Sequence, residues 1–206
     1  MIIGFMSILW LAIKTLGSLF VVACTLRLYL QWVRLHAQNP LSRLTFRMTD
    51  WIVLPLRRFM PSLGHFDWAS FLAALLIALA LVLVYYFLIK WQLLGAGFGS
   101  GEAPVRPFGW LVALALVWML HWSLQLAFVI LIASVLLGWL NPLNPLKPVF
   151  DLLADPMLLP FRRLLQRGDP SRRSGFDFSP IGAFLILQIF SAVVAEIEAK
   201  VLRHLI

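Results

Sequence analysis

Four apolar runs constrain this chain more than any other feature of its sequence. They cover residues 5–32, 68–94, 108–140 and 179–195, and about 20 residues of helix are enough to cross the hydrocarbon core of a bilayer. Hydrophobic residues make up 62% of the 206 residues, more apolar surface than a soluble domain of this length could bury. The sequence therefore predicts an all-α membrane protein with four transmembrane helices.

Three residues inside the first run need an interpretation. Lys14 and Arg27 are charged, and we expect their long side chains to extend outwards to the two membrane edges. Cys24 is the one cysteine, so a disulfide framework within the chain is excluded, and we expect it to be a buried apolar side chain. No basic stretch precedes this run, and no small-residue cleavage site follows it before Arg27, so we expect it to be a retained anchor.

The positive charge is concentrated in two loops. The net charge is +8, and 11 of the 17 Lys and Arg residues lie at 34–67 and 141–178. An excess of Lys and Arg marks cytoplasmic loops. Both basic loops are therefore predicted to be cytoplasmic, with both termini and the linker outside.

An internal repeat relates the two halves of the chain. The first parts of the basic loops align at a constant offset of 105, and five extra residues then enter the second copy. A Gly- and Pro-rich stretch at 95–107 separates the copies, so we divide the chain into a first repeat at 1–94, this linker, and a second repeat at 108–206. Because each repeat holds two spans, both insert the same way up, as parallel two-helix repeats. The matched motif residues are Asn39, Pro40, Asp50, Pro55 and Asp67 in the first copy and Asn144, Pro145, Asp155, Pro160 and Asp177 in the second.

Each basic loop is predicted to contain an amphipathic helix in the membrane interface. Asn39 and Asn144 resemble N-caps, each followed by a proline at the first helical position. Mixed apolar and basic residues follow, and Pro55 and Pro160 are expected to end or kink the helices. In the second copy Asp177, Ser179 and Pro180 then form a similar start for the last span.

Two arginine pairs are the sharpest candidates for a binding site: Arg57 with Arg58, and Arg162 with Arg163. Their recurrence at matched positions favours a site for anionic lipid head groups or an acidic protein partner. The alternative is that they only set the membrane topology. No recognised nucleic-acid-binding module accompanies them.

Catalytic and metal-binding patterns are not found in the sequence. No phosphate-binding loop, nucleophile elbow or zinc-protease motif occurs. His121, the histidine within a span, is interpreted as a hydrogen-bonding residue between helices rather than a haem or metal ligand. Glu196 and Glu198 are interpreted as a solvated helix end, with Glu196 able to pair with Lys200. We therefore expect no enzyme activity, cofactor or metal.

The chain resembles the YggT family of bacterial membrane proteins. The residues that carry the resemblance are Asn144-Pro145, Asp155, Pro160-Phe161-Arg162-Arg163 and Asp177-Phe178-Ser179-Pro180, between apolar spans. The first copy departs from this pattern at its end, where Asp67 is followed by Trp68, Ala69 and Ser70, without the Ser-Pro pair.

The resemblance implies a non-enzymatic protein of the bacterial inner membrane. It suggests roles in osmotic-stress tolerance and in envelope and division homeostasis, with membrane lipids, other membrane proteins or a second copy as partners. Plastid relatives are tied to nucleoid distribution and to cytochrome assembly. Three functions stay open: a membrane-organising or assembly protein, a small transporter or channel for ion balance, and an assembly factor for a membrane cytochrome.

Overall fold

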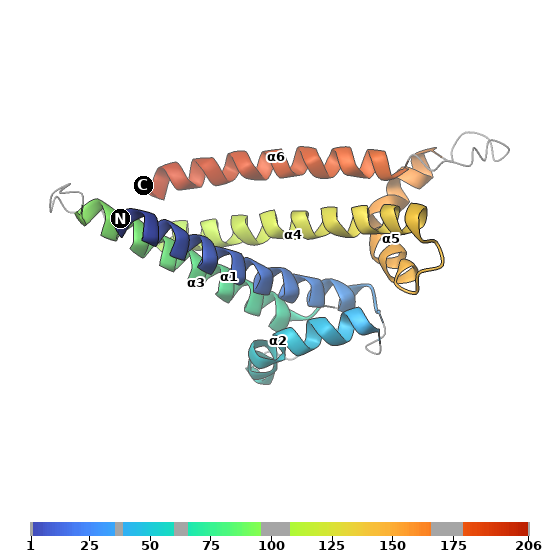
Figure 1. Cartoon of the computed structure of the whole chain (residues 1–206), viewed down its shortest axis with the longest axis horizontal. Helices are drawn as coiled ribbons and strands as arrows, with labels where there is room; N and C mark the ends of the chain where they lie inside the picture. Colours follow the sequence, from blue (N-terminus) through green and yellow to red (C-terminus); the bar gives the residue numbers. More distant parts are fainter. Residues whose placement is uncertain (1, 36–38, 60–65, 96–107, 166–178, 206) are drawn as a thin grey trace. The chain divides into compact units, whose positions relative to one another are not determined.

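The computed structural model describes residues 2–35, 39–59, 66–95, 108–165 and 179–205. Within these ranges the chain forms six helices and no strand (Figure 1). The helices are α1 (Ile2–Trp32), α2 (Pro40–Phe59), α3 (Trp68–Gly95), α4 (Phe108–Leu140), α5 (Lys147–Leu165) and α6 (Ser179–Leu205).

Four of these helices, α1, α3, α4 and α6, are long and apolar enough to cross a membrane. The all-α, four-span prediction is confirmed. The first three begin and end within a few residues of the predicted runs, whereas α6 continues ten residues beyond the predicted end at 195. The last turns of α6 carry charged side chains. These lower the local hydropathy, so a prediction from hydropathy ends the span before the helix ends.

The two shorter helices, α2 and α5, lie in the basic loops. In α2 the Asn39 side chain accepts a hydrogen bond from the Leu41 N–H (3.1 Å), and Pro40 is the first helical residue. Asn144 accepts a similar bond from the Leu146 N–H (2.9 Å), but α5 begins only at Lys147, so Pro145 lies in a turn. Both helices run through Pro55 and Pro160 rather than ending there.

By its contacts the chain forms two compact units. Unit 1 comprises Met1–Trp122 and Glu196–Ile206, and unit 2 comprises Ser123–Ala195. These units do not coincide with the two repeats, because α4 and α6 each contribute to both units. The division into repeats stays a prediction from the sequence.

Unit 1 is built on a close pairing of α1 and α3, with α2 packed against both (Figure 1). A Cβ atom at Gly17 would lie only 2.5 Å from the Leu81 side chain, so the glycine permits this close approach. Alanines continue the same contact on α3, where Ala73, Ala74 and Ala78 are almost completely buried. Small residues on both helices therefore bring the backbones together.

The end of α1 turns the chain towards α2. The N–H of Leu35 bonds the carbonyl of Leu30 (3.0 Å), and the N–H of Arg34 bonds that of Gln31 (3.1 Å). This pattern is a Schellman motif, and Arg34 holds its left-handed position with φ of 59°. An arginine therefore occupies the position at which helices usually have glycine.

Unit 2 contains the second half of α4, all of α5 and the first part of α6. Phe128 on α4 packs against Phe184 on α6 with ring centroids 4.1 Å apart. Gly182 on α6 faces the Phe161 ring of α5, and a Cβ there would lie 2.7 Å from that ring. The buried apolar residues of α5 include Val149, Leu153, Ala154 and Leu158.

Candidate functional site

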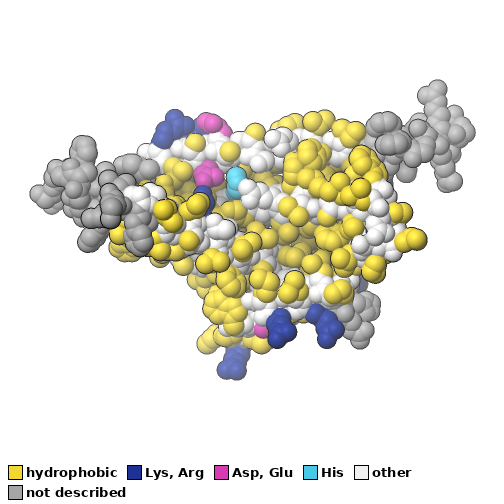
Figure 2. All heavy atoms as spheres, in the orientation of Figure 1, with side chains coloured by type: hydrophobic (Ala, Val, Ile, Leu, Met, Phe, Trp, Pro, Cys, Tyr) yellow, Lys and Arg dark blue, Asp and Glu magenta, His cyan; other side chains and the backbone are white. Residues whose placement is uncertain are grey.

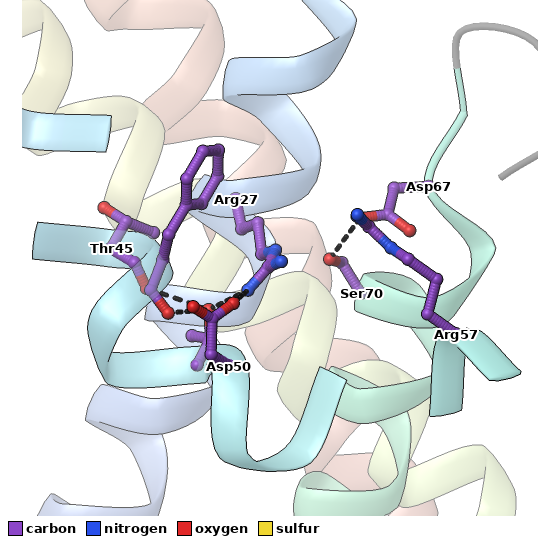
Figure 3. Close-up of polar contacts among 8 residues, drawn as sticks. Arg27, Thr45, Asp50, Arg57, Asp67 and Ser70 are labelled. Atoms are coloured by element: carbon purple, nitrogen blue, oxygen red, sulfur yellow. Dashed lines mark hydrogen bonds and ion pairs between the residues drawn. The ribbon is translucent and has the colours of Figure 1, made fainter. Parts of the chain in front are cut away.

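Arg27 ties the first span to the interfacial helix. Its guanidinium Nη1 donates to Thr49 Oγ1 (2.8 Å) and to Asp50 Oδ1 (2.7 Å) on α2, and its side chain is 4% exposed (Figure 3). The same guanidinium lies 4.8 Å from the centroid of the Phe46 ring. An ion pair between buried Arg27 and the 42% exposed Asp50, with an added hydrogen bond to Thr49, therefore fixes α2 against α1.

The side chain of Arg27 ends on α2, because α2 brings a carboxylate to it. That Arg27 marks a membrane edge stays a prediction. The Lys14 side chain also contacts the protein, since its ammonium nitrogen lies 5.4 Å from the centroid of the Trp118 ring.

A second ion pair joins the end of α2 to the start of α3. Arg57 Nη2 donates to Asp67 Oδ2 (2.7 Å), and the Ser70 hydroxyl donates to the same oxygen (2.7 Å) (Figure 3). Asp67 immediately precedes α3 and is completely buried, whereas the Arg57 side chain is 35% exposed. The carboxylate is therefore both the N-cap of a transmembrane helix and the partner of α2.

The surroundings of Asp67 favour its ionised form. Burial by itself would raise its pKa, but hydrogen bonds from Ser70 and Arg57 and the charge of Arg57 outweigh burial and lower the pKa below 3.8. Asp67 therefore contributes stability at neutral pH that is lost as the pH falls below about 3.8 and through its folded pKa.

The opposite side of α2 is exposed and carries both basic and apolar side chains. Arg43, Arg47 and Arg58 are exposed on α2, and next to them Leu44 is 59% and Trp51 62% exposed. Figure 2 shows Lys and Arg side chains projecting where α2 lies. We call these five residues, together with exposed Met48, the α2 surface.

In unit 2 different side chains hold the interfacial helix. Ser134 on α4 donates to Asp151 Oδ1 on α5 (2.6 Å), and the Lys147 ammonium pairs with the other oxygen of Asp151. Burial raises the pKa of Asp151, but the bonds from Lys147 and Ser134 outweigh burial, so the pKa lies below its usual value. Arg162 pairs with Asp155 within α5 (2.8 Å).

The two arginines of each pair therefore have different surroundings. In each pair the first arginine contacts a carboxylate, Asp67 for Arg57 and Asp155 for Arg162, while Arg58 and Arg163 are exposed. The two carboxylates also differ in burial, because Asp67 is fully buried whereas the Asp155 side chain is 42% exposed. Lipid or partner binding by these arginines stays a prediction.

Other predicted site residues have varied outcomes. Asp50 is a partner of Arg27, a contact that the sequence did not suggest. Asp177 lies outside the described residues, and Ser179 and Pro180 begin α6. Lys147, Ser134 and Asp151 were missed. A signal was available only for Lys147, which lies one turn before Asp151 and can pair with it along a helix.

Glu198 is not part of a solvated helix end. Its Oε1 accepts a hydrogen bond from the Trp118 indole N–H (2.9 Å), and its Oε2 lies 3.7 Å from His121 Nδ1. Glu196, by contrast, is well exposed and lies 3.8 Å from Arg203. The interpretation as a solvated side chain holds for Glu196 only. His121 lies near Glu198 of α6, but the hydrogen bond expected for it stays a prediction. No group of three or more His, Cys, Asp or Glu in the described parts is placed to hold a metal ion.

Comparison with known proteins identifies the family of this chain. The sequence profile of the CCB3/YggT family matches residues 6–92 and again residues 113–197. Uncharacterized protein PA0392 of Pseudomonas aeruginosa is 35% identical over 184 residues, which cover 88% of this chain and 85% of that protein. Uncharacterized protein YggT of Escherichia coli K12 is 28% identical over 193 residues, covering 93% and 92%. No solved structure matches. The chain belongs to the CCB3/YggT family.

Proposed function

We propose that this protein is a non-enzymatic organiser of the bacterial inner membrane that gathers anionic lipid head groups on the α2 surface. In this proposal the basic loops face the cytoplasm, where anionic lipids attract juxtamembrane basic residues. The resemblance to the family suggests that this role serves osmotic-stress tolerance or envelope and division homeostasis.

The observation that carries the proposal is the build of α2. One side of the helix is held to the spans through ion pairs with Arg27 and Asp67, which are themselves buried. The other side leaves Arg43 and Arg47 exposed next to exposed Leu44 and Trp51. Apolar side chains that enter the acyl boundary, beside arginines that reach phosphates, are typical of a helix lying in the membrane interface. Because it is fixed, α2 presents these arginines without losing much entropy on binding.

A pair of charge-matched variants tests the α2 surface. We expect Arg43→Gln with Arg47→Gln to weaken phosphatidylglycerol binding by the full chain in mild detergent about thirtyfold, since each basic residue contributes about 1 kcal/mol. This binding is expected to weaken with added salt. The control, Lys200→Gln with Arg203→Gln, removes the same charge from the exposed end of α6 and should change binding little.

Two outcomes would refute this function. If both double variants weaken binding equally, the attraction is a property of net charge rather than of α2. If the α2 variant binds phosphatidylglycerol like the unmodified protein and its cells survive osmotic shock normally, the arginines only set topology.

The membrane orientation gives a separate prediction. A cytoplasm-active reporter should give signal when inserted at Asn39 and none when inserted at Gly99 or fused to the C-terminus, because the 11 loop charges hold the loops inside. The reverse pattern would place the α2 surface on the outer face and overturn the assigned lipid leaflet.

A small transporter is the second candidate function. Lys14, His121 and Glu198 bring titratable side chains from α1, α4 and α6 to Trp118 within unit 1. Ionisable residues within spans mark ion or proton paths in many membrane proteins. A transporter would additionally need a continuous water-filled path through the spans. The cytochrome-assembly alternative stays open as well.

A further inference from the structure

Unit 2 contains a crevice of about 750 Å³ between α4, α5 and the start of α6. Its walls are mainly apolar, with Leu131, Val135, Trp139, Leu158, Ile181 and Phe184 among the lining residues. This volume lies within the range of about 300–1,000 Å³ that is usual for ligand sites. The crevice is therefore large enough for part of a lipid.

Two of the residues that line the crevice are charged. Lys147 and Arg162, both on α5, are its charged lining residues, and Ser134 lies beside them. Asp151 and Asp155 hold these two cations, but neither carboxylate lines the crevice. An ammonium has three N–H donors and a guanidinium five, so each cation can keep its carboxylate and also bind a phosphate oxygen.

The position of the crevice along the spans matches the build of a phospholipid. Its apolar walls come from the last turns of the α4 span and the first turns of the α6 span. Its cations belong to α5, which lies between those spans in the chain. Charges at the membrane edge and apolar walls within the span correspond to a head group and its acyl chains.

The alignment of the two repeats shows which residue replaces a small one at the crevice. With the five-residue insertion the offset becomes 110, so Ala74 of α3 corresponds to Phe184 of α6. Ala74 is buried at 1% exposure, whereas Phe184 is 37% exposed and lines the crevice. Ala74 fits the close pairing of α1 and α3 in unit 1. The larger Phe184 ring borders the crevice in unit 2.

We propose that this crevice binds one membrane glycerophospholipid, with its phosphate between Lys147 and Arg162 and an acyl chain along Leu131 and Phe184. The site goes beyond the α2 surface and does not depend on it. The α2 surface attracts several head groups through exposed charges, whereas the crevice takes a single lipid by charge and shape together.

Native mass spectrometry of the full chain, delipidated in mild detergent and titrated with phosphatidylglycerol, tests the site. We expect one saturable lipid that persists at high salt. Arg162→Gln should weaken it about tenfold or more, as for loss of a hydrogen bond to a charged group. Arg163→Gln, the exposed neighbour outside the crevice, is the matched control and should leave it unchanged.

A second pair of variants tests the acyl part separately. Gly138 lines the crevice, and a Cβ there would meet only the Lys147 side chain at 3.7 Å, so Gly138→Leu should fill the space without straining the backbone. We expect it to abolish the saturable lipid. Gly109→Leu, on the same helix with nothing within 4 Å, should retain it.

The outcomes separate this site from its alternatives. Loss of binding in Arg162→Gln but not in Gly138→Leu would indicate a phosphate site without acyl recognition and would overturn the proposal. Equal weakening by Arg162→Gln and Arg163→Gln would indicate diffuse attraction and overturn it too. Retained crevice binding in Arg43→Gln with Arg47→Gln would support its independence from the α2 surface.

Discussion

Replacing Asp50 with alanine is expected to lower the free energy of unfolding by about 3–4 kcal/mol, in the lower part of the range for breaking a buried ion pair from one side, because Asp50 is itself 42% exposed. The effect comes from the partner left behind, since the Arg27 side chain is 4% exposed and would keep its hydrogen bond to Thr49 but lose its anion. In a chain of this size the midpoint of thermal unfolding in mild detergent should fall on the order of 10 °C.

The repeat supplies a matched control for this variant. Asp155 corresponds to Asp50 and is equally exposed (42%), but its partner Arg162 is 36% exposed, whereas Arg27 is 4% exposed. Exposed pairs contribute about 0–1 kcal/mol, so Asp155→Ala should have little effect on the unfolding midpoint. Equal losses in the two variants would show that the Arg27 contact does not hold α2.

Replacing Arg57 with alanine should have the second-largest effect, about 3 kcal/mol, near the lower end for a broken buried pair. The variant leaves the fully buried Asp67 carboxylate with Ser70 but without its cation. We place the value low because Arg57 is itself 35% exposed. Arg58→Ala, which removes the same charge from an exposed neighbour, should stay within about 0.5 kcal/mol.

The pH dependence of the Arg57 variant has a definite sign. In the unmodified protein the pKa of Asp67 is lowered on folding, so stability is lost as the pH falls below about 3.8. Burial raises the pKa of Asp67, and contacts with Arg57 and Ser70 lower it. Without Arg57 the lowering is weaker, so the pKa of Asp67 should be higher in the variant. The stability difference between variant and unmodified protein should therefore narrow from pH 7 to pH 4. A difference that widens on acidification would show that Arg57 does not stabilise the ionised carboxylate.

The sequence predicted those features that local pattern controls. Span positions follow from hydropathy and length, and the start of α2 follows from Asn39 and Pro40, because an N-cap acts within one turn. The end of α6 was placed ten residues early. Charged residues there end the hydropathy signal, although the helix itself continues.

Contacts between distant residues could not be predicted in the same way. Arg27 and Asp50 are 23 residues apart, and Trp118 and Glu198 are 80 apart, so nothing in either local pattern names the partner. The alignment of the two repeats did not predict these contacts either. Arg57 and Arg162 align, yet Arg57 reaches the start of the next span whereas Arg162 pairs within its own helix.

The double role of Asp67 has a consequence for two helices at once. The carboxylate that begins α3 also holds the end of α2, and the contacts with Arg57 and Ser70 involve one oxygen atom. Protonation or loss of this carboxylate would therefore weaken the Arg57 contact of α2 and the N-cap of α3 together.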